Sequence, residues 1–126
     1  MGRLCYAQDA TAVTGACLMV SRELYDQVGG LDEEFKVALN DVDFCLKLRK
    51  LGYLNIFTPF CEMYHFESKS RGLDDKDEKA QRYNEEVARF RERWKEELAA
   101  GDPYYNPNFS LNHSNYTLKD WATETE

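Results

Sequence analysis

Three polar side chains at the start of a predicted helix are the residues best placed to do chemistry. Asn40, Asp41 and Asp43 begin an apolar pattern that runs to about Leu51 and is stopped by Gly52. At about 100° per residue, Asp41 falls on the same side as the apolar residues of the pattern. Asp43 falls roughly opposite, toward solvent or the capped end. The dipole of a helix favours an ionised carboxylate at its N-terminus, as a general base requires.

Two other interpretations of these polar residues compete with the general base. Asn40 followed by Asp43 resembles a capping box, in which both side chains satisfy backbone N–H groups; it leaves the inward-facing Asp41 unexplained. The spacing of Asp41 and Asp43 also matches the D-x-D pattern that binds a metal ion and a nucleotide diphosphate. Carboxylates in such sites converge from a loop, whereas two acids two positions apart on a helix diverge. We therefore reject a metal site for this pair.

A histidine and a basic loop follow further along the chain. His65 lies in an apolar stretch typical of a strand, where a lone histidine is more often a hydrogen-bonded structural residue than a ligand. Directly after it, Ser68, Lys69, Ser70 and Arg71 place two cations and two hydroxyls on a predicted surface loop. Such a loop suits phosphate oxygens, or it is simply solvated.

The elements that must position these residues alternate between strands and helices. Residues 10–20 predict a buried strand interrupted at Gly15, where a ligand or a neighbouring backbone can approach closely. Ser21 predicts the cap of a short helix. Residues 53–59 and 60–67 predict two more strands, and a long amphipathic helix is expected at about 75–100. The pattern indicates an α/β fold with a small mixed sheet, flanking helices and a long C-terminal helix.

Composition narrows the class of protein. The chain has 126 residues, of which 43% are hydrophobic, and a net charge of −7. This size supports one modest core, and the charge argues against nucleic-acid binding through phosphates. No stretch is apolar enough to cross a bilayer and no signal peptide is recognisable, which predicts a cytoplasmic protein. The four cysteines lack C-x-x-C spacing, which disfavours a zinc cluster and favours reduced, buried thiols.

Four segments in order carry a resemblance to a known family. They read "VTGACLMVSRELYDQVGGLDEEF", "NDVDFCLKLRKLGY", "TPFCEMYHFESKSRG" and "DPYYNPNFS", and they extend over residues 13–110. Together they resemble the C-terminal half of bacterial family 2 glycosyltransferases of the GT-A type, particularly the rhamnosyltransferase-like group. The resemblance implies the acceptor-side half of a partial GT-A fold over residues 1–110 and a tail over 111–126. It also implies a nucleotide-binding half that this chain lacks.

The resemblance implies roles for individual residues. Asp41 corresponds to the catalytic base, which takes a proton from the acceptor hydroxyl as that oxygen attacks a nucleotide-activated sugar with inversion. Asn40 departs from the family, because an acid is usual there. Gly15 would line the sugar and acceptor site, and Asp32 would bind the sugar unless it only forms a turn. His65 would help to complete a site for a divalent cation, Mn²⁺ or Mg²⁺.

The resemblance also implies partners and a lid. The loop of Ser68, Lys69, Ser70 and Arg71 resembles a lid that closes over the diphosphate leaving group. The partners would be a nucleotide-sugar donor and a saccharide or lipid-linked saccharide acceptor in cell-surface polysaccharide synthesis, with the full-length protein at the inner membrane surface. We expect this chain alone to bind nucleotide-sugar poorly and to transfer nothing, and a homodimer to form through unpaired sheet edges. The alternative is a non-catalytic α/β module that binds a protein or carbohydrate.

Overall fold

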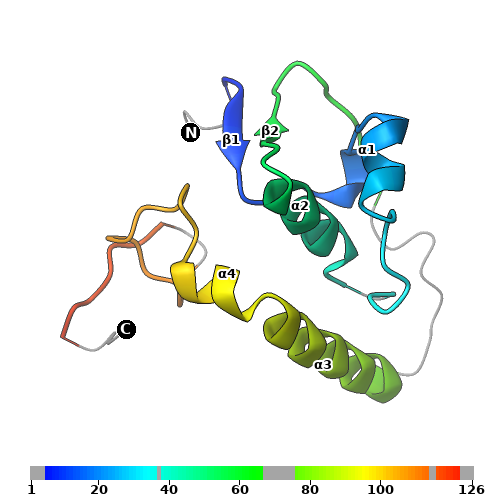
Figure 1. Cartoon of the computed structure of the whole chain (residues 1–126). Helices are drawn as coiled ribbons and strands as arrows, with labels where there is room; N and C mark the ends of the chain where they lie inside the picture. Colours follow the sequence, from blue (N-terminus) through cyan, green and yellow to red (C-terminus); the bar gives the residue numbers. More distant parts are fainter. Residues whose placement is uncertain (1–4, 37, 67–75, 114–115, 123–126) are drawn as a thin grey trace.

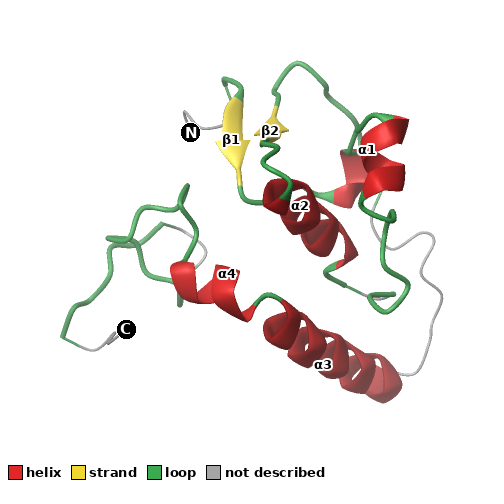
Figure 2. Cartoon of the chain, viewed as in Figure 1, coloured by secondary structure: helices red, strands yellow, loops and turns green. Residues whose placement is uncertain are grey.

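One helix lies at the centre of the molecule, between a small sheet and a pair of helices. The computed structural model describes residues 5–36, 38–66, 76–113 and 116–122. On one side of the central helix lie the sheet and the short helix α1, and on the other lie α3 and α4 (Figures 1 and 2). The elements in order are β1 (Gln8–Ala10), the 3-10 helix η2 (Gly15–Cys17), α1 (Arg22–Gln27), α2 (Asn40–Lys50), β2 (Asn55–Phe57), α3 (Lys76–Arg93) and α4 (Lys95–Ala100).

The short helix α1 forms where the sequence predicts it. The Ser21 hydroxyl accepts a hydrogen bond from the backbone N–H of Leu24 at 3.3 Å, so the predicted cap is confirmed. The helix ends before Gly29 and Gly30, which both have positive φ. A Cβ atom at Gly30 would lie 2.8 Å from the ring of Tyr25, so this glycine is required by close packing as well as by its backbone conformation.

The sheet is smaller than predicted, and among the described residues it is antiparallel rather than mixed. β1 and β2 pair with Asp9 opposite Ile56. The predicted strand over residues 10–20 is wrong beyond Ala10, because the chain turns into η2 and its side chains there are largely exposed. The strand predicted over residues 60–67 is also wrong as far as residue 66, since these residues form no ladder and are exposed. Alternating apolar residues give strands only when a partner strand satisfies their backbone.

The long C-terminal helix is divided in two at Trp94. This residue has φ −108° and ψ 25°, and it separates α3 from α4. Its indole N–H donates to the carboxylate of Asp43 at 2.9 Å, and the Lys50 ammonium lies 5.0 Å from the ring centroid. The sequence predicted one uninterrupted helix, because periodicity registers which face is apolar but not a local change of backbone angle. Gly101, with φ 76°, ends α4 as expected.

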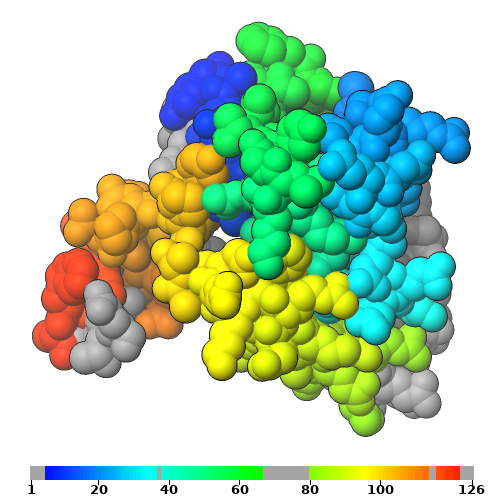
Figure 3. All heavy atoms as spheres, in the orientation of Figure 1, coloured from blue at the N-terminus to red at the C-terminus, as the bar shows by residue number. Residues whose placement is uncertain are grey.

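The buried core joins α2 to α3 and to the loop before α2. Its main cluster consists of Phe35, Leu46, Phe90 and Trp94. In the space-filling view, α3 and α4 (green-yellow and yellow) pack directly beneath α2 (Figure 3). Within α3, the buried Glu86 accepts hydrogen bonds from the backbone N–H groups of Lys36 and Ala38, at 3.0 and 2.9 Å. These bonds tie α3 to the chain just before α2.

The segment after α4 folds back on itself. Phe109 forms an isolated antiparallel bridge with Leu118, and the backbone N–H of Ser110 donates to the carbonyl of Thr117 at 2.8 Å. Residues 116–119 are therefore hydrogen-bonded to residues 108–110, across the predicted boundary between residues 110 and 111.

Candidate functional site

The N-terminus of α2 begins differently from the predicted capping box. Leu39 occupies the cap position in a left-handed conformation, with φ 65° and no side-chain cap. The Asn40 side-chain oxygen accepts from the adjacent N–H of Asp41, at 2.7 Å, and the Asp43 carboxylate accepts from Trp94. The capping box of Asn40 and Asp43 is therefore wrong. Because a leucine side chain has no acceptor, the first N–H groups of the helix depend on other acceptors.

Asp41 is held between its own helix and the η2 turn. One carboxylate oxygen accepts from the backbone N–H of Gly15 at 2.8 Å, and the other accepts from the N–H of Val42 at 2.9 Å. The residue is half-buried. Each carboxylate oxygen has two lone pairs, so one hydrogen bond at each leaves room to accept a proton or a further donor. The arrangement fixes the side chain without using up its capacity as a base.

Gly15 is the residue that permits this placement. A Cβ atom at this position would lie 3.2 Å from the Cβ of Asp41 and 3.5 Å from its Oδ2. The sequence predicted close approach of a ligand or a backbone at Gly15, and the structure shows the approach of the Asp41 side chain.

Asp43 is buried rather than solvent-facing, which corrects the sequence analysis. Its exposed fraction is 0%. One oxygen accepts from Trp94 Nε1 at 2.9 Å and from an Arg93 Nη at 3.1 Å, and Lys47 Nζ lies 3.3 Å from the other oxygen. The prediction that Asp43 faces solvent assumed that only one face of α2 is buried, whereas this helix is covered on two sides. Asp43 is therefore a structural anchor between α2 and the junction of α3 and α4.

Asp32 belongs to the same ionic network. Its Oδ1 accepts from the backbone N–H of Glu34 at 2.9 Å, and its Oδ2 pairs with Arg93. The Glu34 N–H and then the Arg93 guanidinium lower the pKa of Asp32 below its ordinary value. Arg93 also pairs with Glu34 at 2.9 Å and lies over the ring of Phe35. These contacts give Asp32 a clear structural role, while its role as a sugar ligand stays a prediction.

The remaining predicted site residues follow β2 along the chain. His65 lies on the exposed stretch after β2. Ser68, Lys69, Ser70 and Arg71 lie outside the described residues. Among the residues that are described, no group of three or more histidine, cysteine, aspartate or glutamate side chains could hold a metal ion. The described residues thus do not assemble a complete cation site around His65.

The cysteines differ from the expectation of buried thiols. Cys45 is buried. Its sulfur atom lies 3.5 Å from the backbone nitrogen of Val13 and 3.8 Å from the carbonyl oxygen of the same residue. Burial raises the pKa of the Cys45 thiol. Cys5, Cys17 and Cys61 are exposed, so the expectation is wrong for these three.

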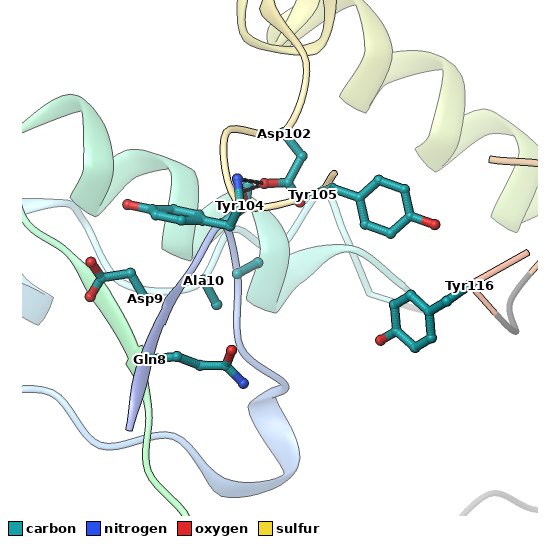
Figure 4. A pocket seen from close by; sticks show the side chains of 9 residues that line it. Gln8, Asp9, Ala10, Asp102, Tyr104, Tyr105 and Tyr116 are labelled. Atoms are coloured by element: carbon teal, nitrogen blue, oxygen red, sulfur yellow. Dashed lines mark hydrogen bonds between the residues drawn. The ribbon is translucent and has the colours of Figure 1, made fainter. Parts of the chain in front are cut away.

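A pocket opens beside β1, away from the Asp41 carboxylate. It measures about 440 Å³ and lies between β1 and the segment after α4 (Figure 4). Tyr104, Tyr105 and Tyr116 line it together with Gln8 and Asp9 of β1, and of the three rings that of Tyr104 lies nearest to Asp9. Asp102 accepts from the hydroxyl of Thr11 and from the N–H of Tyr104, which joins the two walls. Asp41 is not among the residues that line this pocket.

Sequence reasoning missed the residues that organise these contacts. Glu86 and Arg93 lie on the same face of α3 as Phe90, at spacings of four and three, and were interpreted as part of a charged surface. Charged residues at positions within the apolar stripe could have predicted these buried contacts. The pocket tyrosines gave no such signal, because they lie in a segment without periodicity and meet β1 only through the tertiary fold.

Comparisons with known proteins give partial matches to long proteins. The chain is 46% identical over 127 aligned residues to the uncharacterized protein y4gI of Sinorhizobium fredii, covering 98% of this chain and 14% of that protein. It is 35% identical over 108 residues to the O-antigen biosynthesis protein RfbC of Myxococcus xanthus, covering 86% and 8% respectively. It is 39% identical over 62 residues to the N-acetylglucosaminyl-diphospho-decaprenol L-rhamnosyltransferase of Mycobacterium tuberculosis, covering 49% and 20%.

These matches support a likeness to glycosyltransferases at the level of a segment. The chain is similar to part of each protein. It spans between 8% and 20% of the lengths of these relatives. No family model matches the chain, and no solved structure matches it either. None of the helices in the described ranges is both long and apolar enough to span a membrane.

Proposed function

We propose that this chain is the acceptor-side part of an inverting glycosyltransferase of the GT-A type, with Asp41 as its general base. The observation that carries the proposal is the placement of Asp41 at the start of α2, where the N–H of Gly15 holds it at 2.8 Å. Similarity to a rhamnosyltransferase and to an O-antigen biosynthesis protein supports the reaction class.

The chemistry assigned to Asp41 is a single proton transfer. Its carboxylate accepts the proton of an acceptor hydroxyl while that oxygen attacks the anomeric carbon of the donor sugar. The bond between this carbon and the nucleotide diphosphate breaks on the opposite side, so the configuration inverts. The two backbone hydrogen bonds fix the carboxylate in one orientation, which reduces the ordering needed in the transition state.

The remaining site residues are assigned by resemblance. Gly15 and Asp32 would border the sugar and acceptor site, and Arg71 would pair with the leaving diphosphate together with Ser68, Lys69 and Ser70. A divalent cation, Mn²⁺ or Mg²⁺, would neutralise that diphosphate. His65 would supply one nitrogen ligand, and the other ligands would come from outside the described residues.

The proposed substrates are a nucleotide-sugar donor and a saccharide or lipid-linked saccharide acceptor, used in cell-surface polysaccharide synthesis. A cytoplasmic location, at the inner face of the membrane for a longer protein, would give access to both. These assignments come from the names of the partial relatives and from the resemblance over residues 13–110.

The decisive variant is Asp41→Asn, made in the longest polypeptide that carries this segment. Because asparagine keeps the hydrogen-bonding shape but cannot take a proton, turnover should fall by at least about 100-fold while donor binding stays within about twofold. Asp26→Asn, which removes an exposed carboxylate from α1, is the matched control. Unchanged turnover in the Asp41 variant, with a folded protein, would overturn the assignment.

The chain by itself is expected to bind donor weakly. Calorimetric titration with UDP- and dTDP-sugars in the presence of Mn²⁺ measures this directly. Micromolar affinity would show that this chain by itself already holds the nucleotide, contrary to the proposal of an acceptor-side part.

A second candidate function is carbohydrate binding without catalysis, which the tyrosine-lined pocket favours. Aromatic faces beside carboxylate and amide side chains suit the apolar and hydroxyl faces of a sugar ring, and about 440 Å³ lies within the usual range for ligand pockets. Tyr104→Ala should abolish saccharide binding if the pocket is the site, with Tyr53→Ala as the control. An effect of Asp41→Asn on turnover, with no effect of Tyr104→Ala on binding, would reject this alternative.

A further inference from the structure

Two exposed cysteines from distant parts of the chain meet at the surface. Cys17 is the last residue of η2, and Cys61 lies on the stretch that follows β2, 44 residues later. Their sulfur atoms are 3.8 Å apart and share a hydrogen bond. Both are exposed, whereas Cys45, on α2, is buried.

We propose that Cys17 and Cys61 are a reversible dithiol modification site, which a peroxide converts to an intramolecular disulfide. A disulfide requires the sulfurs to approach to about 2.05 Å. Neither cysteine lies in a long helix or a paired strand, so a small movement of either segment can close the remaining distance. The proposal does not rest on the proposed catalytic function.

The oxidation balances with one peroxide and two thiols. One thiolate attacks a peroxide oxygen, the O–O bond breaks, and the departing hydroxide takes up a proton to form water, which leaves a sulfenic acid. The second sulfur then attacks the sulfenic sulfur, displaces hydroxide and gives its proton to it. Two electrons pass from the sulfur atoms to the peroxide, and two water molecules are formed.

The position of the pair gives the bond a structural consequence. The turn that contains Cys17 also contains Gly15, whose N–H holds the Asp41 carboxylate. A disulfide would tether this turn to the stretch leading to His65. The turn would then have fewer ways to move relative to α2, because the crosslink closes a loop between residues far apart in sequence.

The test uses the 126-residue chain in a Cys5→Ser background. This substitution is needed because trypsin leaves Cys5 and Cys17 on one peptide, residues 4–22, while Cys61 lies on residues 51–69. The protein is treated with hydrogen peroxide, alkylated, digested and analysed by mass spectrometry. The hydrogen bond that Cys17 shares with Cys61 raises the pKa of the Cys17 thiol, so the treatment is made at mildly alkaline pH. Added Cys17→Ser or Cys61→Ser provides the matched controls.

We expect the linked pair of peptides as the main product. Formation of this disulfide should be independent of protein concentration, reversed by dithiothreitol and lost in both controls. Oxidation should also slow hydrogen exchange at the Gly15 amide. Dimers linked between chains, sulfinic acids on both cysteines, or thiols that survive the treatment would each overturn the dithiol site. Unchanged exchange at Gly15 would overturn the tether to the Asp41 turn.

Discussion

At the scale of single residues, the two acids of α2 divide into one site candidate and one anchor. Asp41 is half-buried and held by backbone N–H groups, whereas Asp43 is fully buried among Arg93, Trp94 and Lys47. A buried carboxylate with charged partners is costly to remove, because its partners then lose their compensating charge. Asp41 is therefore the site candidate and Asp43 the structural anchor, although the two aspartates are only two positions apart.

Asp43→Asn tests the anchor. We expect the free energy of unfolding to fall by about 2–3 kcal/mol, because the partly buried Lys47 loses its carboxylate and Arg93 keeps only Asp32 and Glu34. Urea unfolding followed by tryptophan fluorescence measures the change. Asp26→Asn, in an exposed pair with Arg22, should alter stability by no more than about 0.5 kcal/mol. Equal effects of the two variants would contradict the anchoring role.

Asp32 makes stability depend on acid pH. The Glu34 N–H and Arg93 lower the pKa of Asp32 in the folded protein. The contribution of this carboxylate to stability is therefore fully present above its unfolded pKa, about 3.9, and is lost as the pH falls through the folded pKa. Below about pH 5, the unfolding free energy of wild type should therefore decrease more steeply than that of Asp32→Asn. Thermal unfolding over a pH series measures the slopes, with Asp26→Asn as a control for net charge. Parallel slopes for wild type and Asp32→Asn would contradict the prediction.

At the scale of elements, glycine positions fix how α1 meets the loop that leads to α2. Gly29 and Gly30 both have positive φ, but only Gly30 is in close contact with the Tyr25 ring. Tyr25 in turn packs on Phe44 of α2, with ring centroids 5.5 Å apart. The end of α1 is therefore coupled to the central helix.

Alanine substitutions separate the two constraints. Gly29→Ala introduces backbone strain alone and should cost about 1 kcal/mol. Gly30→Ala adds a steric clash and should cost about 1–2 kcal/mol more, because the Tyr25 ring must move. Chemical denaturation of both variants measures the difference. Equal losses would show that the tyrosine ring shifts freely.

At the scale of the whole molecule, a small core leaves much apolar surface uncovered. Phe60 is 88% exposed and Tyr64 is 92% exposed, on the stretch after β2. Within the described residues, β1 and β2 pair only with each other, so each presents an outer edge. Unpaired edges and apolar surface both favour association with another chain.

The expected association is a homodimer through the sheet edge. Light scattering should give a mass above that of a monomer that rises with concentration. Ile56→Lys, on the exposed side of β2, should shift the protein toward monomer, because a lysine on an edge strand opposes further pairing. Leu111→Lys, on the segment after α4, is the control. A clean monomer for wild type at all concentrations would contradict the prediction.

The elements that depend on local chemistry follow from the amino-acid sequence. The Ser21 cap, the glycines after α1 and the Gly101 stop were all predictable, because caps and left-handed turns are set by neighbouring residues. The bounds of α2 were predictable from the apolar pattern, although its cap was not. Periodicity and resemblance both singled out Asp41, whose role as the general base stays a prediction.

Which side chains meet depends on the tertiary structure. Asp43 is buried because Arg93 and Trp94, at the junction of α3 and α4, cover a second face of α2. Trp94 contacts Asp43 and Lys50 at the point where the two helices divide. The 3.8 Å approach of Cys17 and Cys61 and the pocket beside β1 arise in the same way. Periodicity along one chain identifies an apolar face, but the number of faces that are covered and the pairs in contact depend on packing between segments far apart in the sequence.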